Sequence, residues 1–171
     1  MARLADNRDM SVATADLSDA DPDAQVAEPI FRDFGGLTSF HGTAVTAKVF
    51  EDNSLVRTLL GEPGTERVLI VDGGGSLRCA LVGGNLAQLA LTHGWQGIVI
   101  NGCIRDSEEI RALKIGVKAL GAHPRKSAKG LHNGHRDHRV CFAGVTFRTG
   151  QWVYADSDGI VVSDKPLHSL V

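Results

Sequence analysis

Two continuous apolar runs with a glycine-led helical segment between them constrain the fold of this chain most strongly. Runs of this kind are typical of strands that are covered on both faces of a sheet. The leucines of the intervening segment recur at helical spacing. After the second run, another short helical segment and a third apolar run follow. We therefore expect strands at residues 68–71, 97–101 and 115–122, and helices at residues 83–93 and 107–113. Strands and helices that alternate in this way predict a parallel βαβ core.

The segments before this core predict smaller elements. Helix-capping and turn residues stand between short runs of apolar and β-branched side chains. We expect a helix at residues 14–20 capped by Thr14, a turn at 31–36, a strand at 41–50, and a helix at 53–60. Asn53 or Ser54 caps the second of these helices, and Ser107 caps the short helix of the core.

The segments after the core change character. Short β-rich runs separated by glycines predict antiparallel hairpins, with strands at residues 140–142, 145–147, 152–155 and 160–162. Residues 126–136 are rich in glycine and charge and predict a mobile surface loop. Residues 123–126 form a small basic patch, suited to a subunit interface or to an anionic ligand. The chain therefore predicts one α/β domain with a mixed sheet at residues 13–171, after a frayed polar tail at residues 1–12.

Composition and charge exclude several classes of protein. The chain has 171 residues, enough for one domain with its own core, and a formal net charge of −2 without a basic stripe. This argues against direct binding of nucleic acid. No apolar run approaches about 18 residues, and the N-terminus lacks the apolar segment of a signal peptide, so we expect a cytoplasmic protein without a membrane partner. Three cysteines without paired spacing are expected to be reduced thiols.

The glycine run at residues 73–75 follows a predicted strand, as glycines do in many nucleotide-binding proteins. A phosphate-binding loop needs a Gly-Lys-Ser/Thr sequence, which does not occur, and a dinucleotide fingerprint from Gly73 needs glycine where Arg78 stands. A nucleophile elbow around Ser76 fails at the same arginine. The run therefore predicts a tight turn with positive φ.

The start of the helix predicted from Gly83 is a candidate anion site. Gly83, Gly84, Asn85 and Leu86 form its first turn, where backbone amides have no intrahelical partner. Glycine lets a ligand approach these amides closely. The carboxylate of a small keto acid would fit there; alternatively, the glycines serve only the turn.

Arg105 and Asp106 follow the apolar strand at residues 97–101. Arginine pairs with a carboxylate through two parallel hydrogen bonds, and aspartate is a hard oxygen ligand suited to Mg²⁺ or Mn²⁺. Glu109 follows one helical turn later and could orient a water on the metal. The alternative is a surface ion pair, but ligands of α/β sheets commonly bind at strand ends. We expect Asp106 to hold the metal, and Arg105 and Glu109 to take part in catalysis.

The remaining reactive side chains have simpler interpretations. Cys103 could be a nucleophile, but a small buried strand residue is the favoured interpretation. His132, His135 and His138, with Asp137, invite a zinc assignment. Their spacing matches neither a paired-cysteine site nor a helical His-Glu motif, so a solvated loop is favoured.

These residues together resemble the RraA-like family, which includes 4-hydroxy-4-methyl-2-oxoglutarate aldolases and regulators of ribonuclease E activity. The resemblance covers about residues 14–164, and its segments read TADLSDADPDA, EPIFRDFGG, VLIVDGGGSLRCALVGGNLAQLA, GWQGIVINGCIRD, IGVKALGAHPRKS and AGVTFRTGQWVYADSDGIVVS. The aldolases of the family carry glycine, twenty residues, Arg-Asp, two residues and an acid. Here Gly84, Arg105, Asp106 and Glu109 satisfy that spacing.

The resemblance implies a swivelling-domain-like α/β/β/α fold and a homotrimer with sites between subunits. It implies a divalent cation, Mg²⁺ or Mn²⁺, held by Asp106 with water, and substrate contacts from Arg105 and the amides of residues 83–86. It also implies a class II aldolase that cleaves 4-hydroxy-4-methyl-2-oxoglutarate to two pyruvates and decarboxylates oxaloacetate.

Two departures from the family pattern and two rival functions belong beside this expectation. Several relatives carry aspartate where this chain has Gly84, and the chain ends at Val171 without the acidic tail of some aldolases. A non-enzymatic regulator that binds and inhibits ribonuclease E is the main rival. Members known only as regulators can lack the aspartate that Asp106 provides here. A methyltransferase that uses the glycine turn is a weaker rival, because the spaced glycines are missing.

Overall fold

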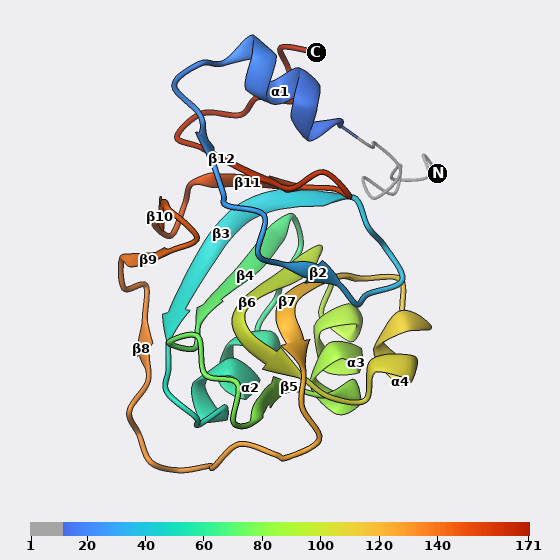
Figure 1. The fold of residues 1–171 in the computed structure, drawn as a ribbon, viewed down its shortest axis with the longest axis vertical. Helices are drawn as coiled ribbons and strands as arrows, with labels where there is room; N and C mark the ends of the chain where they lie inside the picture. Colours follow the sequence, from blue (N-terminus) through green and yellow to red (C-terminus); the bar gives the residue numbers. More distant parts are fainter. Residues whose placement is uncertain (1–11) are drawn as a thin grey trace.

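The computed structural model describes residues 12–171, so almost all of the tail predicted at residues 1–12 lies outside the described residues. Within them, ten strands form one mixed sheet in the order β1-β12-β11-β3-β4-β6-β7-β2, with β5 beside β6 and β8 beside β3 (Figure 1). Their bounds are β1 (Gln25–Val26), β2 (Arg32–Asp33), β3 (Phe40–Lys48), β4 (Arg67–Asp72), β5 (Ala80–Val82), β6 (Gly97–Ile104), β7 (Gly116–Ala122), β8 (His135–Arg136), β11 (Trp152–Ala155) and β12 (Ile160–Ser163).

The centre of the sheet is parallel, as the βαβ order predicts. β3, β4, β6 and β7 pair side by side in parallel, with Val68 opposite Gly97 and Ile98 opposite Val117. The strands are apolar along their whole length because both faces are covered, and the side chains of β4 from Val68 to Val71 are fully buried. The three predicted core strands are confirmed, and β6 continues three residues further than expected, to Ile104.

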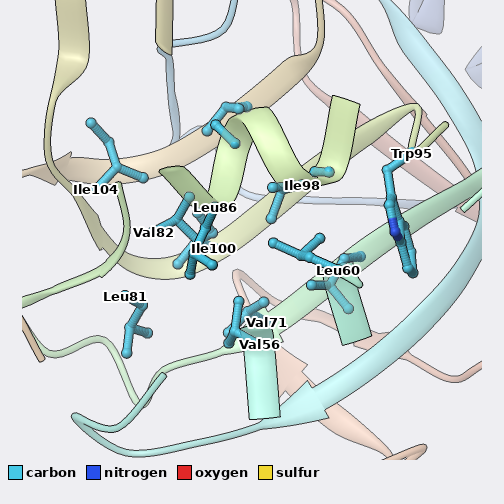
Figure 2. Close-up of a cluster of buried hydrophobic side chains, with 14 of the residues drawn as sticks. Val56, Leu60, Val71, Leu81, Val82, Leu86, Trp95, Ile98, Ile100 and Ile104 are labelled. Carbon is cyan, nitrogen blue, oxygen red and sulfur yellow. The ribbon is translucent and has the colours of Figure 1, made fainter. Parts of the chain in front are cut away.

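Helices cover one face of the sheet. These are α2 (Ser54–Leu60), α3 (Gly84–Thr92) and α4 (Ser107–Arg111) (Figure 1). Their apolar side chains recur at helical spacing. They pack against Leu69 and Val71 of β4 and against Ile98, Ile100 and Ile104 of β6. Figure 2 shows this core, in which Leu60 and Leu86 approach Val71, Ile98 and Ile100.

A small hairpin covers the other face. It consists of β9 (Val140–Phe142) and β10 (Val145–Phe147), which pair antiparallel as predicted. Phe142 and Phe147 stack at 4.7 Å between ring centroids and belong to a second core with Ile70 and Val99. The predicted hairpin of β11 and β12 is also confirmed, and it extends the main sheet beyond β3.

The first helix, α1 (Thr14–Ala20), confirms the predicted element but not its cap. Ala13 occupies the cap position, while the amide and hydroxyl of Thr14 donate to the Asp156 carboxylate at 2.8 Å and 2.6 Å. An acid distant in sequence therefore satisfies this helix end. Ser107 is likewise inside α4, whose cap position is Asp106.

Short edge strands are the other difference from prediction. The turn expected at residues 31–36 contains β2, which pairs antiparallel with β7 through Arg32 opposite Ala119. Strands β1, β5 and β8 were not predicted, because two or three residues carry no periodic signal.

No helix within residues 12–171 is long and apolar enough to cross a membrane.

Candidate active site

A pocket of about 80 Å³ lies beyond the carboxyl end of the parallel strand β6, beside the start of α3. Strand β5 lies at its base, with Ala80 among the lining residues. In Figure 1, β5 lies between α2 and α3, so the pocket has one wall from each helix and the loops beside it. This is the edge of the sheet at which α/β proteins commonly bind ligands.

The first wall joins the start of α3 to the end of β6. The Arg105 amide donates to the Val82 carbonyl at 2.9 Å, which fixes the turn after β6 beside β5. The Gly84 amide donates to Oδ2 of Asp106 at 3.0 Å. One oxygen of Asp106 thus satisfies the helix start, and Oδ1 forms no hydrogen bond with the residues that the structure describes.

The backbone of Asp106 is in the left-handed conformation, with φ 57° and ψ 43°. A non-glycine residue pays a steric penalty there, and aspartate is among the residue types that tolerate it best. The conformation ends β6 and begins α4 within one residue, and it brings the carboxylate to the pocket. Backbone strain of this kind clusters at functional sites.

Two glycines leave room for the acidic side chains of this wall. A Cβ on Gly83 would lie 2.7 Å from Oδ2 of Asp106, and a Cβ on Gly84 would collide with the Glu109 carboxylate. Glu109 therefore fills the space that a side chain at position 84 would need. This gives a physical meaning to the departure at Gly84, because aspartate there would have to displace Glu109.

The predicted site residues are largely brought together. Gly83, Asn85, Leu86, Arg105 and Asp106 line the pocket, as the sequence predicts. Gly84 is buried beneath them, and its amide contributes through Asp106. Glu109 lies behind Gly84 and is not among the residues that line the pocket.

The second wall was missed from the sequence. It consists of Asn53 and Arg57 from α2 together with Lys126, Ser127 and Lys129. Most of these lie in the segment predicted to be a mobile loop, and no spacing rule connects them with the glycines or with Arg105. The basic patch predicted at residues 123–126 gave one signal, since it left an anionic ligand open as an interpretation.

Backbone hydrogen bonds hold this second wall in place. The Arg125 carbonyl accepts from Ala80 at 2.8 Å, and the Ala128 amide donates to Glu51 at 2.8 Å. The buried Asp52 carboxylate then accepts from Ser54 at 2.8 Å and from the Leu131 amide at 2.6 Å. Residues 126–131, part of the segment 126–136 that the sequence predicts to be a mobile loop, are therefore attached to both β5 and α2.

The buried Asp52 carboxyl group has a lowered pKa. Burial raises the pKa of this carboxyl group, but the hydrogen bonds from the Ser54 and Leu131 amides outweigh burial and hold the pKa below its usual range. The carboxylate connects the first turn of α2 to the loop after Lys129. It therefore stabilises the second wall rather than acting on a ligand.

The pocket carries an excess of positive charge. Arg57, Arg105, Lys126 and Lys129 line it, against the single carboxylate of Asp106. None of these four cations forms an ion pair within residues 12–171. Uncompensated cations that converge on a concave site favour an anionic ligand.

For a divalent cation the pocket offers a single protein ligand. The free oxygen of Asp106 is a hard ligand, and no group of three histidine, cysteine, aspartate or glutamate side chains that could hold a metal occurs in residues 12–171. A cation here would take its remaining ligands from water and substrate, which a Lewis-acid site requires.

The glycine turn and Cys103 have structural roles. Gly74 and Gly75 have φ of 67° and 72°, so the predicted positive-φ turn is confirmed. The Asp72 carboxylate accepts from Gly74 at 2.9 Å and from the Asn101 amide group at 3.0 Å, which closes this turn. Cys103 is 2% exposed, and burial raises the pKa of its thiol, which confirms the interpretation as a buried strand residue.

Residues 132–138, which carry the three histidines considered for a zinc site, pair with β3 through the short strand β8. Ala47 lies opposite Arg136 and Lys48 opposite His135, while Asp137 accepts from the Thr149 hydroxyl at 2.7 Å. Arg136 binds Glu62 at 2.9 Å. The segment thus has a structural function at the edge of the sheet.

Comparison with known proteins gives consistent relatives. The sequence profile of the RraA-like family, described as Aldolase/RraA, matches residues 14–162. A Deinococcus radiodurans protein provisionally named 4-hydroxy-4-methyl-2-oxoglutarate aldolase is 57% identical over 151 residues, which are 88% of this chain and 94% of the relative. An Alkalilimnicola ehrlichii protein with the same provisional name is 56% identical over 160 residues, covering 92% and 98%.

Two solved structures match closely. The RNA-processing inhibitor RraA from Thermus thermophilus has a TM-score of 0.89 at 46% identity, covering 92% of this chain and 95% of that one. A Geobacillus kaustophilus protein titled S-adenosylmethionine:2-dimethylmenaquinone methyltransferase has a TM-score of 0.89 at 48% identity, covering 92% and 98%. The architecture predicted from the sequence is that of these structures.

Proposed function

The chain belongs to the RraA-like family, and on that premise we propose that it is a divalent-metal-dependent aldolase cleaving 4-hydroxy-4-methyl-2-oxoglutarate to two pyruvates. Oxaloacetate decarboxylation is the proposed side reaction. The observation that carries the proposal is the convergence of Arg105, Asp106 and the first amides of α3 on one positively charged pocket. Two relatives that are 56–57% identical carry the aldolase name and support it.

The keto acid end of the substrate binds at the first wall. Gly84 donates its amide to Asp106, and Ala87 donates to the Gly83 carbonyl, which leaves the amides of Asn85 and Leu86 without an intrahelical partner. These two amides and the Arg105 guanidinium bind the carboxylate. The anion thereby lies beside the free oxygen of Asp106.

Asp106 would hold the Mg²⁺ or Mn²⁺ ion through Oδ1, with Oδ2 kept in place by Gly84. When bound, the ion supplies Lewis-acid polarisation of the keto oxygen. Because the helix start fixes the carboxylate, this ligand is oriented before substrate arrives. That preorganisation is the part of catalysis that the fold itself provides.

Cleavage breaks the bond between C3 and C4 of the substrate. The C4 hydroxyl loses its proton and becomes the keto group of one pyruvate, and the electron pair of the broken bond forms the enolate of the other. Arg105 stabilises the negative charge that develops there. Loss of carbon dioxide from oxaloacetate forms the same enolate, so one site supports both reactions.

Glu109 acts through a water in this proposal and does not contact the substrate. It lies behind Gly84, outside the residues that line the pocket. We propose that it orients a water that transfers the proton. The substrate itself contacts Arg105 and the amides.

We also propose that the protein is a cytoplasmic homotrimer, with a neighbouring subunit close to the pocket.

The rival proposal is a regulator that binds a ribonuclease. The match to the RNA-processing inhibitor RraA, with a TM-score of 0.89, favours it. A methyltransferase reading has less support, because Asp72 at the glycine turn is already bonded to Gly74 and Asn101. Retention of Arg105 and Asp106 in a built pocket favours the lyase.

A coupled pyruvate assay tests the proposal directly. The purified protein is supplied with 4-hydroxy-4-methyl-2-oxoglutarate or oxaloacetate in Mg²⁺ or Mn²⁺ buffer, with and without a chelator. We expect pyruvate from both acids and its loss with the chelator. Absence of pyruvate in either metal, together with copurification of a ribonuclease, would favour the regulator. Size-exclusion chromatography with light scattering tests the trimer.

A further inference from the structure

The second wall of the pocket has no assigned role in the reaction as described so far. The near end of the substrate uses Arg105 and the α3 amides, all of which lie on the first wall. Arg57, Lys126 and Lys129 remain, and none of them pairs with an acid within the described part of the chain. Three cations that line one pocket favour an anionic ligand there.

The same wall contains a buried amide group. Asn53 donates its side-chain amide to the Leu81 carbonyl at 3.1 Å, which fixes the orientation of the group. Its Oδ1 atom is buried and has no hydrogen-bond partner in residues 12–171. Buried polar atoms in native proteins are rarely left unpaired, and a missing ligand or water is a common reason. An amide oxygen accepts hydrogen bonds, so its partner is a donor such as a water and not the carboxylate of a ligand.

The wall is also rigid enough to define a site. The bond from the Ala80 amide to the Arg125 carbonyl and the bond from the Leu131 amide to Asp52 fix the ends of the segment that carries Lys126 and Lys129. Arg57 follows one turn after the Asn53 carbonyl, to which its own amide donates at 3.0 Å. The cations thus project from fixed backbone, which is a requirement for specific recognition.

We propose that Arg57, Lys126 and Lys129 form a second anion subsite that binds the far carboxylate of a keto dicarboxylate with a five-carbon main chain. The near carboxylate occupies the α3 amides and Arg105. The inference rests on the proposed function and assigns the residues that bind the far carboxylate of its substrate. The residues of this wall select the ligand, and those of the first wall carry the chemistry.

Two matched ligands isolate the far carboxylate. 2-Oxoglutarate and 2-oxopentanoate share the keto acid end and the five-carbon chain, and only the former has a carboxylate at C5. Neither has a C4 hydroxyl, so neither can undergo the cleavage. Calorimetric titration in Mg²⁺ buffer therefore measures binding without turnover.

We expect the wild-type protein to bind 2-oxoglutarate at least about tenfold more tightly than 2-oxopentanoate, because one charge-assisted hydrogen bond provides a difference of that size. Arg57→Gln should bring this ratio towards one and leave the affinity for 2-oxopentanoate within about twofold. Arg57 is exposed and its side chain bonds to no described residue, so the variant should fold. Lys126→Gln and Lys129→Gln divide the remaining effect between the lysines.

Lys114→Gln is the matched control, because Lys114 is exposed and outside the pocket. It removes the same charge and should keep the wild-type ratio. Equal affinity of the wild-type protein for the two acids, or no binding of either, overturns the subsite. A parallel loss of both affinities in Arg57→Gln overturns it as well. If the ratio behaves as expected but no pyruvate is released from the hydroxy acid, the lyase proposal fails and the subsite stands.

Discussion

Oδ2 of Asp106 accepts a hydrogen bond from the Gly84 amide at 3.0 Å, although 22 positions separate the two residues in the sequence. The bond joins the start of α3 to the end of β6. It explains why the glycine and the Arg-Asp pair belong to one motif, since each positions the other. It also separates two roles of Asp106, one oxygen for the helix and one for a ligand.

Asp106→Asn separates these two roles. The asparagine oxygen can still accept from Gly84, and asparagine tolerates the left-handed backbone with φ 57°. We expect the melting temperature to stay close to that of the wild type, while metal-dependent pyruvate release falls about 100-fold or more. The coupled assay and thermal unfolding measure the two effects.

Asp106→Ala is the companion variant. It removes both the ligand and the acceptor for the Gly84 amide, so it should lose activity and also lower the melting temperature. Near-normal activity in either purified variant would refute the assignment of Asp106.

Gly83→Ala should disturb the first wall. The new Cβ would lie 2.7 Å from Oδ2 of Asp106 and 3.3 Å from Cγ of Arg105, so both side chains must shift. Displacement of about 1 Å at a catalytic group lowers turnover by about 100-fold. We expect a loss of at least about tenfold in kcat for oxaloacetate.

Gly121→Ala is the control for that substitution. Gly121 lies in β7, and a Cβ there meets no atom within 4 Å. The control should keep the wild-type rate. Equal rates for Gly83→Ala and wild type would show that the first wall is not part of the reaction.

The ion pair between Lys118 and Asp33 contributes to stability away from the site. Nζ lies 2.9 Å from Oδ1, and the Lys118 side chain is only 4% exposed. Asp33→Ala would leave a buried ammonium without its partner, so we expect a loss of about 3 kcal/mol in the free energy of unfolding. Urea denaturation measures it.

Glu108→Ala provides the comparison for this pair. Its partner Arg111 is also exposed, and both side chains are mostly in solvent. A change of no more than about 0.5 kcal/mol is expected there. If the two variants were equally stable, Lys118 would be satisfied by groups other than Asp33.

The parts of the fold that the sequence predicts well are those with local causes. The run from Val68 to Val71 is apolar because both faces of β4 are covered, and this burial can be read from four consecutive residues. Gly74 and Gly75 have positive φ because the chain turns after Asp72, which the glycine run itself indicates. In both cases the structural cause lies within the segment that carries the pattern.

The parts that escape prediction depend on contacts between distant residues. Thr14 is bonded to Asp156, and nothing near either residue reveals the partner. The second wall depends on Ala80 bonding to Arg125 and on Asp52 bonding to Leu131. A loop rich in glycine and lysine gives no local sign that two such contacts will fix it beside a pocket. Its charges could be counted from the sequence, but not placed.

A histidine and aromatic cluster at the opposite ends of the parallel strands predicts a pH dependence of stability. The His41 ring stacks on Tyr154 at 5.6 Å and lies 5.5 Å from the His168 ring, both measured between centroids. Nδ1 of His168 is 2.9 Å from the Tyr154 hydroxyl oxygen, and Trp152 and Glu66 complete the surrounding groups. Burial, followed by the charge on His168, lowers the pKa of His41, against an opposing effect of Glu66.

The sign of the effect follows from this lowered pKa. When the pH falls below the usual value of about 6.5, the unfolded chain takes up a proton on His41 before the folded protein does, so the free energy of unfolding decreases. We expect the melting temperature to fall between about pH 7.5 and 5.5, above the range in which carboxylates titrate. His41→Gln should flatten this slope, and His168→Gln should raise the pKa of His41 in an NMR titration because one repelling charge is removed. His138→Gln, at an exposed histidine outside this cluster, should leave the slope as in the wild type. A slope that is the same in His41→Gln would assign the pH dependence to other groups.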